Sequence, residues 1–190
     1  ILHGLMGSGD NWRTHALELS KYFTVYCVDL RDHGRSAHSG QISYPLMTAD
    51  ILELMDDEGL EQAALLGHSM GGKVVMQAAL NHPARVSRLI VADMAPQDYF
   101  ERHTLILDAL ESVNLPQLKT RQEAEQILAE RGLEPGVYQF LLKSLYRKED
   151  GGFGWRFNLS AIRADYQNIL VDIDANGKTF DKPALFIRGG

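Results

Sequence analysis

The stretch Ala64-Leu65-Leu66-Gly67-His68-Ser69-Met70-Gly71-Gly72-Lys73-Val74-Val75-Met76 decides the fold of this chain. A short apolar run enters the motif Gly67-x-Ser69-x-Gly71, and a stretch with helical periodicity follows at once. Strand, tight turn and helix in this order are the context in which G-x-S-x-G forms a nucleophile elbow. Small residues on both sides let strand and helix pass closely while the serine takes a strained, positive φ. We therefore predict that Ser69 is a nucleophile; the simpler alternative is a turn serine that caps the helix.

Two phosphate-binding interpretations of the glycines are weaker. The run Gly67–Lys73 also fits G-x-x-x-x-G-K, but Val74 stands where a nucleotide-binding loop needs Ser or Thr to hold magnesium. A branched alkyl group cannot ligate that ion. Gly7-x-Gly9-x-x-Trp12, with Asp29 further on, imitates a dinucleotide fingerprint, but tryptophan replaces the glycine that close helix–strand packing requires.

Length and composition bound the remaining possibilities. A chain of 190 residues forms one domain, with or without an inserted lid. A net charge of −6 gives no sign of a nucleic-acid or anionic-membrane partner, and no apolar run is long enough to span a bilayer. Cys27 is the single cysteine, so there is neither a disulfide framework nor metal-ligand spacing. These features predict a cytoplasmic protein without a metal site. Nothing points to a particular oligomeric state.

Strand and helix signals alternate through the first half of the chain, which predicts a parallel sheet with helices on both faces. The expected elements are a helix at Asn11–Lys21, a strand at Phe23–Val28, a helix from Pro45 to Gly59, the strand and helix around the elbow, and a strand at Arg88–Asp93. We expect the strands that end at Val28, Leu66 and Ala92 to lie side by side. The two ends, Ile1–Gly4 and Pro183–Gly190, resemble strands cut through a sheet, which predicts a fragment.

A mostly helical stretch follows the last of these strands. Helices are expected at Tyr99–Val113, at Thr120–Arg131 behind the capping box Thr120-x-x-Glu123, at Gly136–Arg147 and at Leu159–Ile173. The chain then divides into a core at 1–95, a helical lid at 96–181 and a return strand of the core at 182–190. Lids exclude water and shape substrate pockets. The alternative is a second packing layer without a gating role.

Three motifs in this order resemble the α/β-hydrolase superfamily: His3–Ser8 before the first helix, Asp29–Ser36 after the second strand, and Gly67–Gly72 at the elbow. Gly72-Lys73, Asp93–Pro96 with Asp98-Tyr99, and Phe140–Ser144 make the chain similar to small bacterial acyl-ester and acyl-thioester hydrolases related to mitochondrial abhydrolase-domain proteins. The resemblance implies an α/β-hydrolase fold, a mostly parallel sheet with a helical lid, here truncated at both ends. Much of the superfamily has glycine where this chain has Asp32; the narrower branch tolerates Asn or Asp there.

The resemblance implies transfer of an acyl group to water, with a small acyl ester or acyl-CoA-like thioester as substrate and no cofactor. Ser69 would attack the carbonyl and hold the acyl group covalently. The amides of Leu5 and Met70 would form the oxyanion hole, each such donor contributing about 3 kcal/mol to lowering the barrier. Gly4 lets the Leu5 loop approach the elbow.

The base and the acid complete the expected triad. Such enzymes use the chain order Ser, acid, His, so the histidine should follow the final strand, whereas the last histidine here is His103. The base is therefore expected beyond residue 190. Asp93 follows the strand after the elbow unit, a position that the resembling branch uses for its acid. Alternatively, Asp93 only caps its turn and the acid lies in the segment beyond residue 190.

Other functions of the same fold stay open. A carbon–carbon hydrolase or a cofactor-free perhydrolase would share the triad. A non-catalytic binding module usually loses the serine or the oxyanion glycine, and this chain keeps both Ser69 and Gly4.

Overall fold

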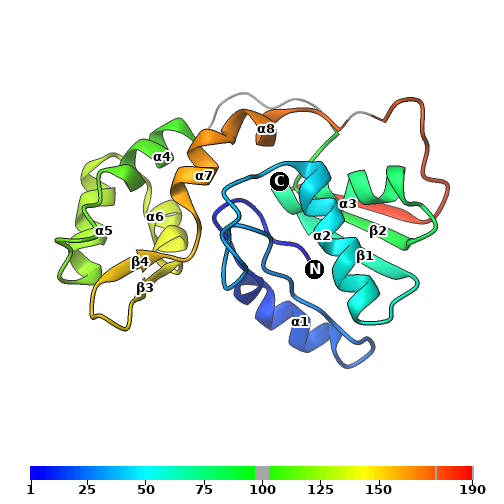
Figure 1. Cartoon of the computed structure of the whole chain (residues 1–190), viewed down its shortest axis with the longest axis horizontal. Helices are drawn as coiled ribbons and strands as arrows, with labels where there is room; N and C mark the ends of the chain where they lie inside the picture. Colours follow the sequence, from blue (N-terminus) through cyan, green and yellow to red (C-terminus); the bar gives the residue numbers. More distant parts are fainter. Residues whose placement is uncertain (97–102, 174, 190) are drawn as a thin grey trace.

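The computed structural model of the chain describes residues 1–96, 103–173 and 175–189. Two groups of elements are visible, a sheet-centred core and a mainly helical group beside it (Figure 1). Among the helices built from described residues, none combines the length and apolarity needed to cross a bilayer.

The core sheet is parallel and places the ends of its strands at one edge. Its hydrogen-bonded strands follow the order β1 (Ala63–His68), β2 (Val86–Ala92) and β5 (Ala184–Ile187). Ala92 at the end of β2 lies opposite His68 of β1 on one side and Ile187 of β5 on the other. Parallel sheets place functional groups outside these carboxyl ends.

The sheet continues past β1 through the first residues of the chain. Leu2 forms isolated parallel bridges to Gly67 and to Val28, so it lies between Val28 and β1. The prediction that the strands ending at Val28, Leu66 and Ala92 are direct neighbours is therefore wrong for the first of them, because the Ile1–Leu2 segment occupies the place next to β1.

The strand predicted at Phe23–Val28 is also reduced, to the single bridge at Val28. Its aromatic and β-branched content favours a strand, but a strand also needs a partner along its length. Among the described residues only the Ile1–Leu2 segment pairs with it, through Val28 and the carbonyl of Tyr26, and Phe23 is 60% exposed.

Helical segments cover the sheet: η1 (Gly9–Trp12), α1 (Arg13–Leu19), α2 (Tyr44–Asp57) and α3 (Met70–Asn81). The single helix expected at Asn11–Lys21 is thus divided into a 3-10 turn and a short α-helix. Ser43 caps α2 by accepting a hydrogen bond from the Leu46 amide, and Gly59, with a φ of +67°, follows its end. Helix α3 packs against β1, β2 and α2, which explains why it is apolar almost all round.

Residues 103–170, which lie between β2 and β5 and which we call the insertion, form a mainly helical group beside the core sheet (Figure 1). Its elements are α4 (Thr104–Glu111), α5 (Arg121–Glu130), α6 (Pro135–Leu142), β3 (Leu145–Arg147), β4 (Phe153–Trp155), α7 (Leu159–Ala164) and α8 (Tyr166–Leu170). The start expected at Tyr99 for the first helix lies outside the described residues. The helix expected at Gly136–Arg147 is wrong after Leu142, because its last residues pair with β4 as a hairpin. The helix expected at Leu159–Ile173 is divided at Asp165.

Leucines from three helices form the core of the insertion. Leu107, Leu128 and Leu141 are almost fully buried. Thr120 caps α5 by accepting from the Glu123 amide, but the Glu123 carboxylate accepts from the amide of Lys119, so the predicted capping box closes one residue early. The domain boundaries at 95 and 181 stay predictions.

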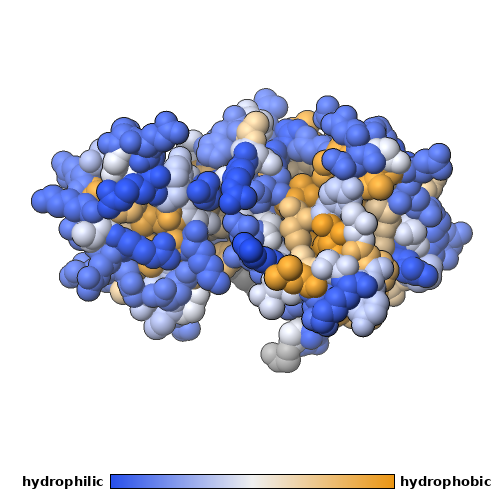
Figure 2. All heavy atoms as spheres, turned by 90° about the horizontal axis from the view of Figure 1, so that it is seen from below, coloured by the Kyte–Doolittle hydropathy of each residue, from blue (hydrophilic) through white to orange (hydrophobic). Residues whose placement is uncertain are grey.

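The insertion is joined to the core through α8 and the elbow helix. The Tyr44 hydroxyl of α2 donates to the Ile169 carbonyl at 2.6 Å. Lys73, fully buried in α3, donates to the carbonyls of Leu170, at 3.3 Å, and of Val171. A cation at the carboxyl end of a helix is favourable. Figure 2 shows larger apolar patches over the core half than over the insertion.

Candidate active site

Ser69 occupies a sharp turn between β1 and α3. Its φ of 51° and ψ of −120° lie outside the ordinary helical and extended regions. Hydrogen bonds fix the turn on both sides, because the Ser69 amide donates to the Ala92 carbonyl and the Ser69 carbonyl accepts from the Gly72 amide. A strained residue of this kind costs about 1–3 kcal/mol and persists where its surroundings over-determine it. The backbone geometry therefore agrees with the predicted elbow.

The glycines on either side of Ser69 have no room for a side chain. A Cβ on Gly67 would lie 2.1 Å from the Gly71 carbonyl oxygen, and one on Gly71 would lie 2.6 Å from the carbonyl oxygens of Leu2 and His3. These are backbone atoms, which no rotamer change can move. Strand β1, helix α3 and the first loop thus meet at this point.

The loop after Leu2 brings the predicted oxyanion residues near the serine. The Gly7 amide donates to the Gly4 carbonyl at 3.0 Å, and Met6 has a φ of 61°. A Cβ on Gly4 would lie 3.1 Å from the Nδ1 of His68 and 3.2 Å from the Cβ of Ser69, so any larger residue would crowd the elbow. Within the part of the chain that the structure describes, the amides of Leu5 and Met70 have no protein acceptor. Both donors are thus available for a ligand.

A cavity of about 370 Å³ opens beside Ser69. The first loop, η1 and α1, the elbow, and the insertion all contribute to its wall. The lining residues are His3, Gly4, Leu5, Gly7, Asn11, Trp12, His15, His68, Ser69, His103 and Phe140. The insertion supplies His103 and Phe140. The sequence carries no signal that these two reach the serine, because the contact depends on how the insertion packs.

His3 is a structural residue of this cavity wall. Its Nε2 accepts from the Leu30 amide at 3.0 Å, so its Nδ1 carries the proton and donates to the Gly4 carbonyl at 2.7 Å. Burial lowers the pKa of His3, which keeps the ring neutral. Both nitrogens are therefore committed to holding the loop.

Two further histidines lie near this edge: His33, which is fully buried, and His68, which is half-buried. Burial lowers the pKa of His33 to about 3, and its Nδ1 contacts the Arg31 carbonyl. His68, the neighbour of Ser69 in sequence, lines the same cavity. Burial lowers the pKa of His68, and the charge of Asp93 partly offsets that effect. No histidine in the described ranges hydrogen-bonds to the Ser69 hydroxyl.

Asp93 lies at the end of β2, at the same edge of the sheet as Ser69. Its amide donates to the Ile187 carbonyl at 2.7 Å, and its carboxylate faces the Gly189 amide at 3.5 Å. It is close enough to act electrostatically on His68. The position fits a triad acid; the role stays a prediction.

Backbone strain gathers at this edge. Met6, Asp32, Ser69 and Asp93 have φ values of 61°, 60°, 51° and 52°, and each follows a different strand segment of the sheet. We call these four the edge residues. Strained conformations of this kind cluster at functional sites.

Comparison with known proteins identifies the family. Residues 1–128 match the family model for the alpha/beta hydrolase fold. The chain belongs to the α/β-hydrolase family. This hydrolase chain is 38% identical over 193 residues to the esterase YbfF of Escherichia coli K12, and the alignment covers all of this chain and 72% of that protein. It is 36% identical over 200 residues to the sn-1-specific diacylglycerol lipase ABHD11 of Danio rerio, covering all of this chain and 62% of the relative.

A solved structure described as a marine microorganism esterase matches with a TM-score of 0.94 and 42% identity, over 99% of this chain and 74% of that one. The resemblance drawn from the motifs is therefore confirmed, including its link to abhydrolase-domain proteins. The chain spans 72% of the first curated relative and 62% of the other. These relatives are esterases and lipases, so this α/β hydrolase groups with carboxylic ester hydrolases.

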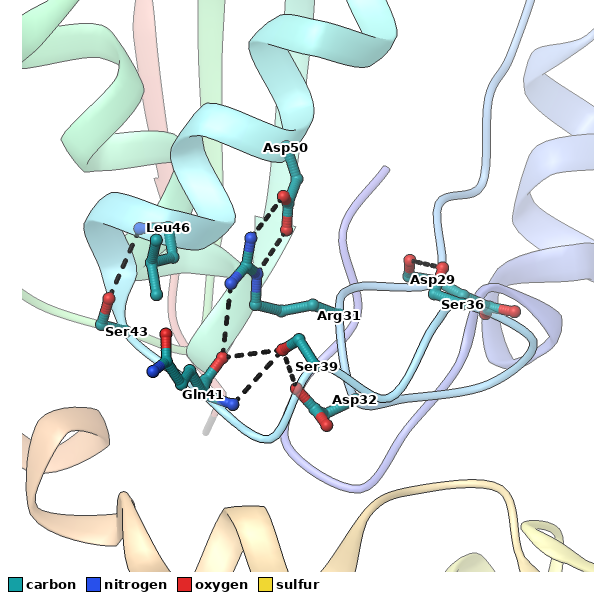
Figure 3. A network of polar contacts seen from close by, with 9 residues as sticks. All are labelled: Asp29, Arg31, Asp32, Ser36, Ser39, Gln41, Ser43, Leu46 and Asp50. Atoms are coloured by element: carbon teal, nitrogen blue, oxygen red, sulfur yellow. Dashed lines mark hydrogen bonds and ion pairs between the residues drawn. The ribbon is translucent and has the colours of Figure 1, made fainter.

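Asp32 stands in the turn where much of the family has glycine, and its φ of 60° explains that preference. Its carboxylate accepts from the Ser39 hydroxyl, the Gly40 amide and the Asn158 side chain of the insertion. Figure 3 shows Asp32 directed at Ser39. Burial alone would raise the pKa of Asp32, but these hydrogen bonds outweigh it and lower the pKa. The departure from glycine thus ties the core turn to the insertion.

Proposed function

We propose that this chain forms the catalytic body of a serine hydrolase that cleaves carboxylic esters through an acyl-enzyme. One observation carries the proposal: Ser69 sits on a strained turn in the wall of a cavity, near two amides that have no protein acceptor among the described residues. Such preorganised donors are the largest single term in many acyl-transfer reactions.

The reaction proceeds in two halves. The Ser69 hydroxyl loses its proton to a base as its oxygen attacks the ester carbonyl, and the Leu5 and Met70 amides hold the resulting oxyanion. The carbonyl re-forms as the alcohol leaves with a proton from the same base. Water then attacks the acyl-enzyme by the same route and releases the carboxylic acid.

The base in this proposal is an imidazole that Asp93 orients. His3 cannot serve, because both of its ring nitrogens are already bound. We place the base outside these 190 residues, since none of the described histidines hydrogen-bonds to the Ser69 hydroxyl. The open alternative inside the chain is His68, which shares the cavity and feels the charge of Asp93.

The cavity wall supports small acyl substrates. Leu5, Trp12 and Phe140 give it an apolar part that suits a short acyl chain. The insertion, through His103 and Phe140, acts as the lid over this cavity. Thioesters expose the same carbonyl to the same nucleophile, so acyl-CoA-like compounds are a second substrate class. The names of the relatives favour ester cleavage over carbon–carbon cleavage.

Hydrolysis of p-nitrophenyl acetate, p-nitrophenyl butyrate and acetyl-CoA tests the proposal. Two forms are assayed: the 190-residue chain, and the gene-encoded protein, meaning this chain with any sequence that its gene encodes before Ile1 or after Gly190. Ser69→Ala should lower kcat of the gene-encoded protein by about 10⁴-fold or more. Ser20→Ala, which removes an exposed hydroxyl on the core, is the matched control. Unchanged turnover in Ser69→Ala would refute the nucleophile, and full turnover by the 190-residue chain would place the base at a histidine within it, such as His68.

A further inference from the structure

The loop that carries Leu5 is held by the insertion as well as by the core. The Ser144 hydroxyl donates to the Met6 carbonyl at 3.1 Å, across 138 residues of sequence. Both residues are buried, with exposed fractions of 7% for Ser144 and 2% for Met6. Water therefore does not readily replace this hydrogen bond, and its loss would leave a buried carbonyl without a partner.

The bond acts at the strained point of the loop. Gly4 to Gly7 form a turn closed by the Gly7 amide and the Gly4 carbonyl, with Leu5 and Met6 in its two central positions. The positive φ of Met6 at the second central position is the requirement of a type II turn, which glycine or asparagine usually fills. Methionine holds this conformation only when its surroundings enforce it. His3 fixes the first carbonyl of the turn and Ser144 fixes the third.

Ser144 is itself placed by the framework of the insertion. Its amide donates to the Leu141 carbonyl at the end of α6, and its carbonyl accepts from the Arg156 amide just after β4. Phe140, four residues earlier, lines the cavity beside Ser69. The same segment of the insertion therefore contacts both the cavity and the loop.

We infer that Ser144 is a positioning residue for the oxyanion hole. By holding the Met6 carbonyl, it keeps the Gly4–Gly7 turn in the conformation that presents the Leu5 amide at the cavity. The insertion thus completes the catalytic geometry as well as covering it. This inference rests on the proposed function, because it assigns the Leu5 amide to the oxyanion.

The test compares Ser144→Ala with Ser112→Ala in the gene-encoded protein. Ser112 is the matched control, because its hydroxyl also donates to a backbone carbonyl within the insertion, that of Ala109 at 2.7 Å, away from the loop. Displacing one oxyanion donor should lower kcat of Ser144→Ala by about 10- to 100-fold, with KM within about twofold of wild type. Ser112→Ala should keep both constants. A Ser144→Ala kcat equal to that of Ser112→Ala would overturn the inference.

Two further measurements keep the test decisive. Ser144→Cys keeps the shape of the side chain and replaces the hydroxyl with a weaker donor, so it should lower kcat even if Ser144→Ala does not fold. An unchanged kcat in a folded Ser144→Cys would overturn the inference. Amide NMR and hydrogen exchange at Leu5 and Met6 need no turnover. Shifted signals and faster exchange in the Ser144 variants, but not in Ser112→Ala, support the positioning role. If the signals and exchange rates of Leu5 and Met6 in the Ser144 variants equal those of wild type, the positioning role is refuted. If the signals and rates do change but the wild-type protein has no esterase activity, only the proposed function is refuted.

Discussion

A methyl group added at three glycines should produce three different stability changes. At Gly67 the new Cβ would lie 2.1 Å from the Gly71 carbonyl oxygen, about 1 Å inside the shortest contact that real Cβ atoms make. The atoms that would have to move are backbone, so Gly67→Ala should cost more than about 3 kcal/mol. At Gly72 the nearest atoms are side-chain carbons of Met94 and Val91, at 3.0 and 3.2 Å, a much milder contact than the one at Gly67. Gly72→Ala should therefore cost about 1 kcal/mol.

Gly136 is the matched control for this series. It lies in the first turn of α6 with no atom within 4 Å of an added Cβ, and its φ is not positive. Gly136→Ala should therefore stabilise the fold by about 0.5 kcal/mol, because alanine restricts the unfolded chain.

Urea unfolding followed by circular dichroism measures all three variants, with m-values checked for a common transition. The free energy of unfolding should be highest for Gly136→Ala and should decrease in the order wild type, Gly72→Ala and Gly67→Ala. A Gly67→Ala variant within 0.5 kcal/mol of wild type would refute the close approach of β1 and α3 on which the elbow depends. Equal losses at Gly67 and Gly136 would refute it as well.

Two carboxylates give further predictions. Hydrogen bonds lower the pKa of Asp32 in the fold, so its contribution is present above about pH 4 and is lost as the pH falls through the lowered value. Acid titrations of stability should accordingly show wild type losing more stability below pH 4 than Asp32→Asn does; parallel curves would contradict this. Asp93→Asn should lower kcat of the gene-encoded protein by about 10⁴-fold without changing its melting temperature, and a loss below tenfold would assign the acid elsewhere.

The local part of this fold could be predicted from the sequence. Gly67, Ser69 and Gly71 specify the elbow because their spacing reports a steric constraint between neighbouring elements. Pro45 and Gly59 likewise mark the ends of α2, since each acts on the backbone within one turn. These signals need no knowledge of the rest of the molecule.

Contacts between distant segments could not be predicted in the same way. The prediction of a strand at Phe23–Val28 was wrong because strand propensity does not report which segment is available to pair with it. The sequence showed that Asp32 replaces a glycine of the family pattern. It did not show the hydrogen bond of Asp32 to Asn158, because the two residues lie 126 positions apart. Nothing local marks the reach of His103 to the cavity either, because that depends on how the insertion packs against the core.

The four edge residues set a limit on how this protein can be made more robust. Glycine would fit the backbone of Met6, Asp32, Ser69 or Asp93 with less strain than the native side chain, so an engineer who selects for heat resistance alone would be drawn toward glycine there. Each such gain would remove a side chain that the edge uses. Thermostable variants are therefore better sought on the outer surfaces of α5 and α6, where a change leaves the strained edge untouched.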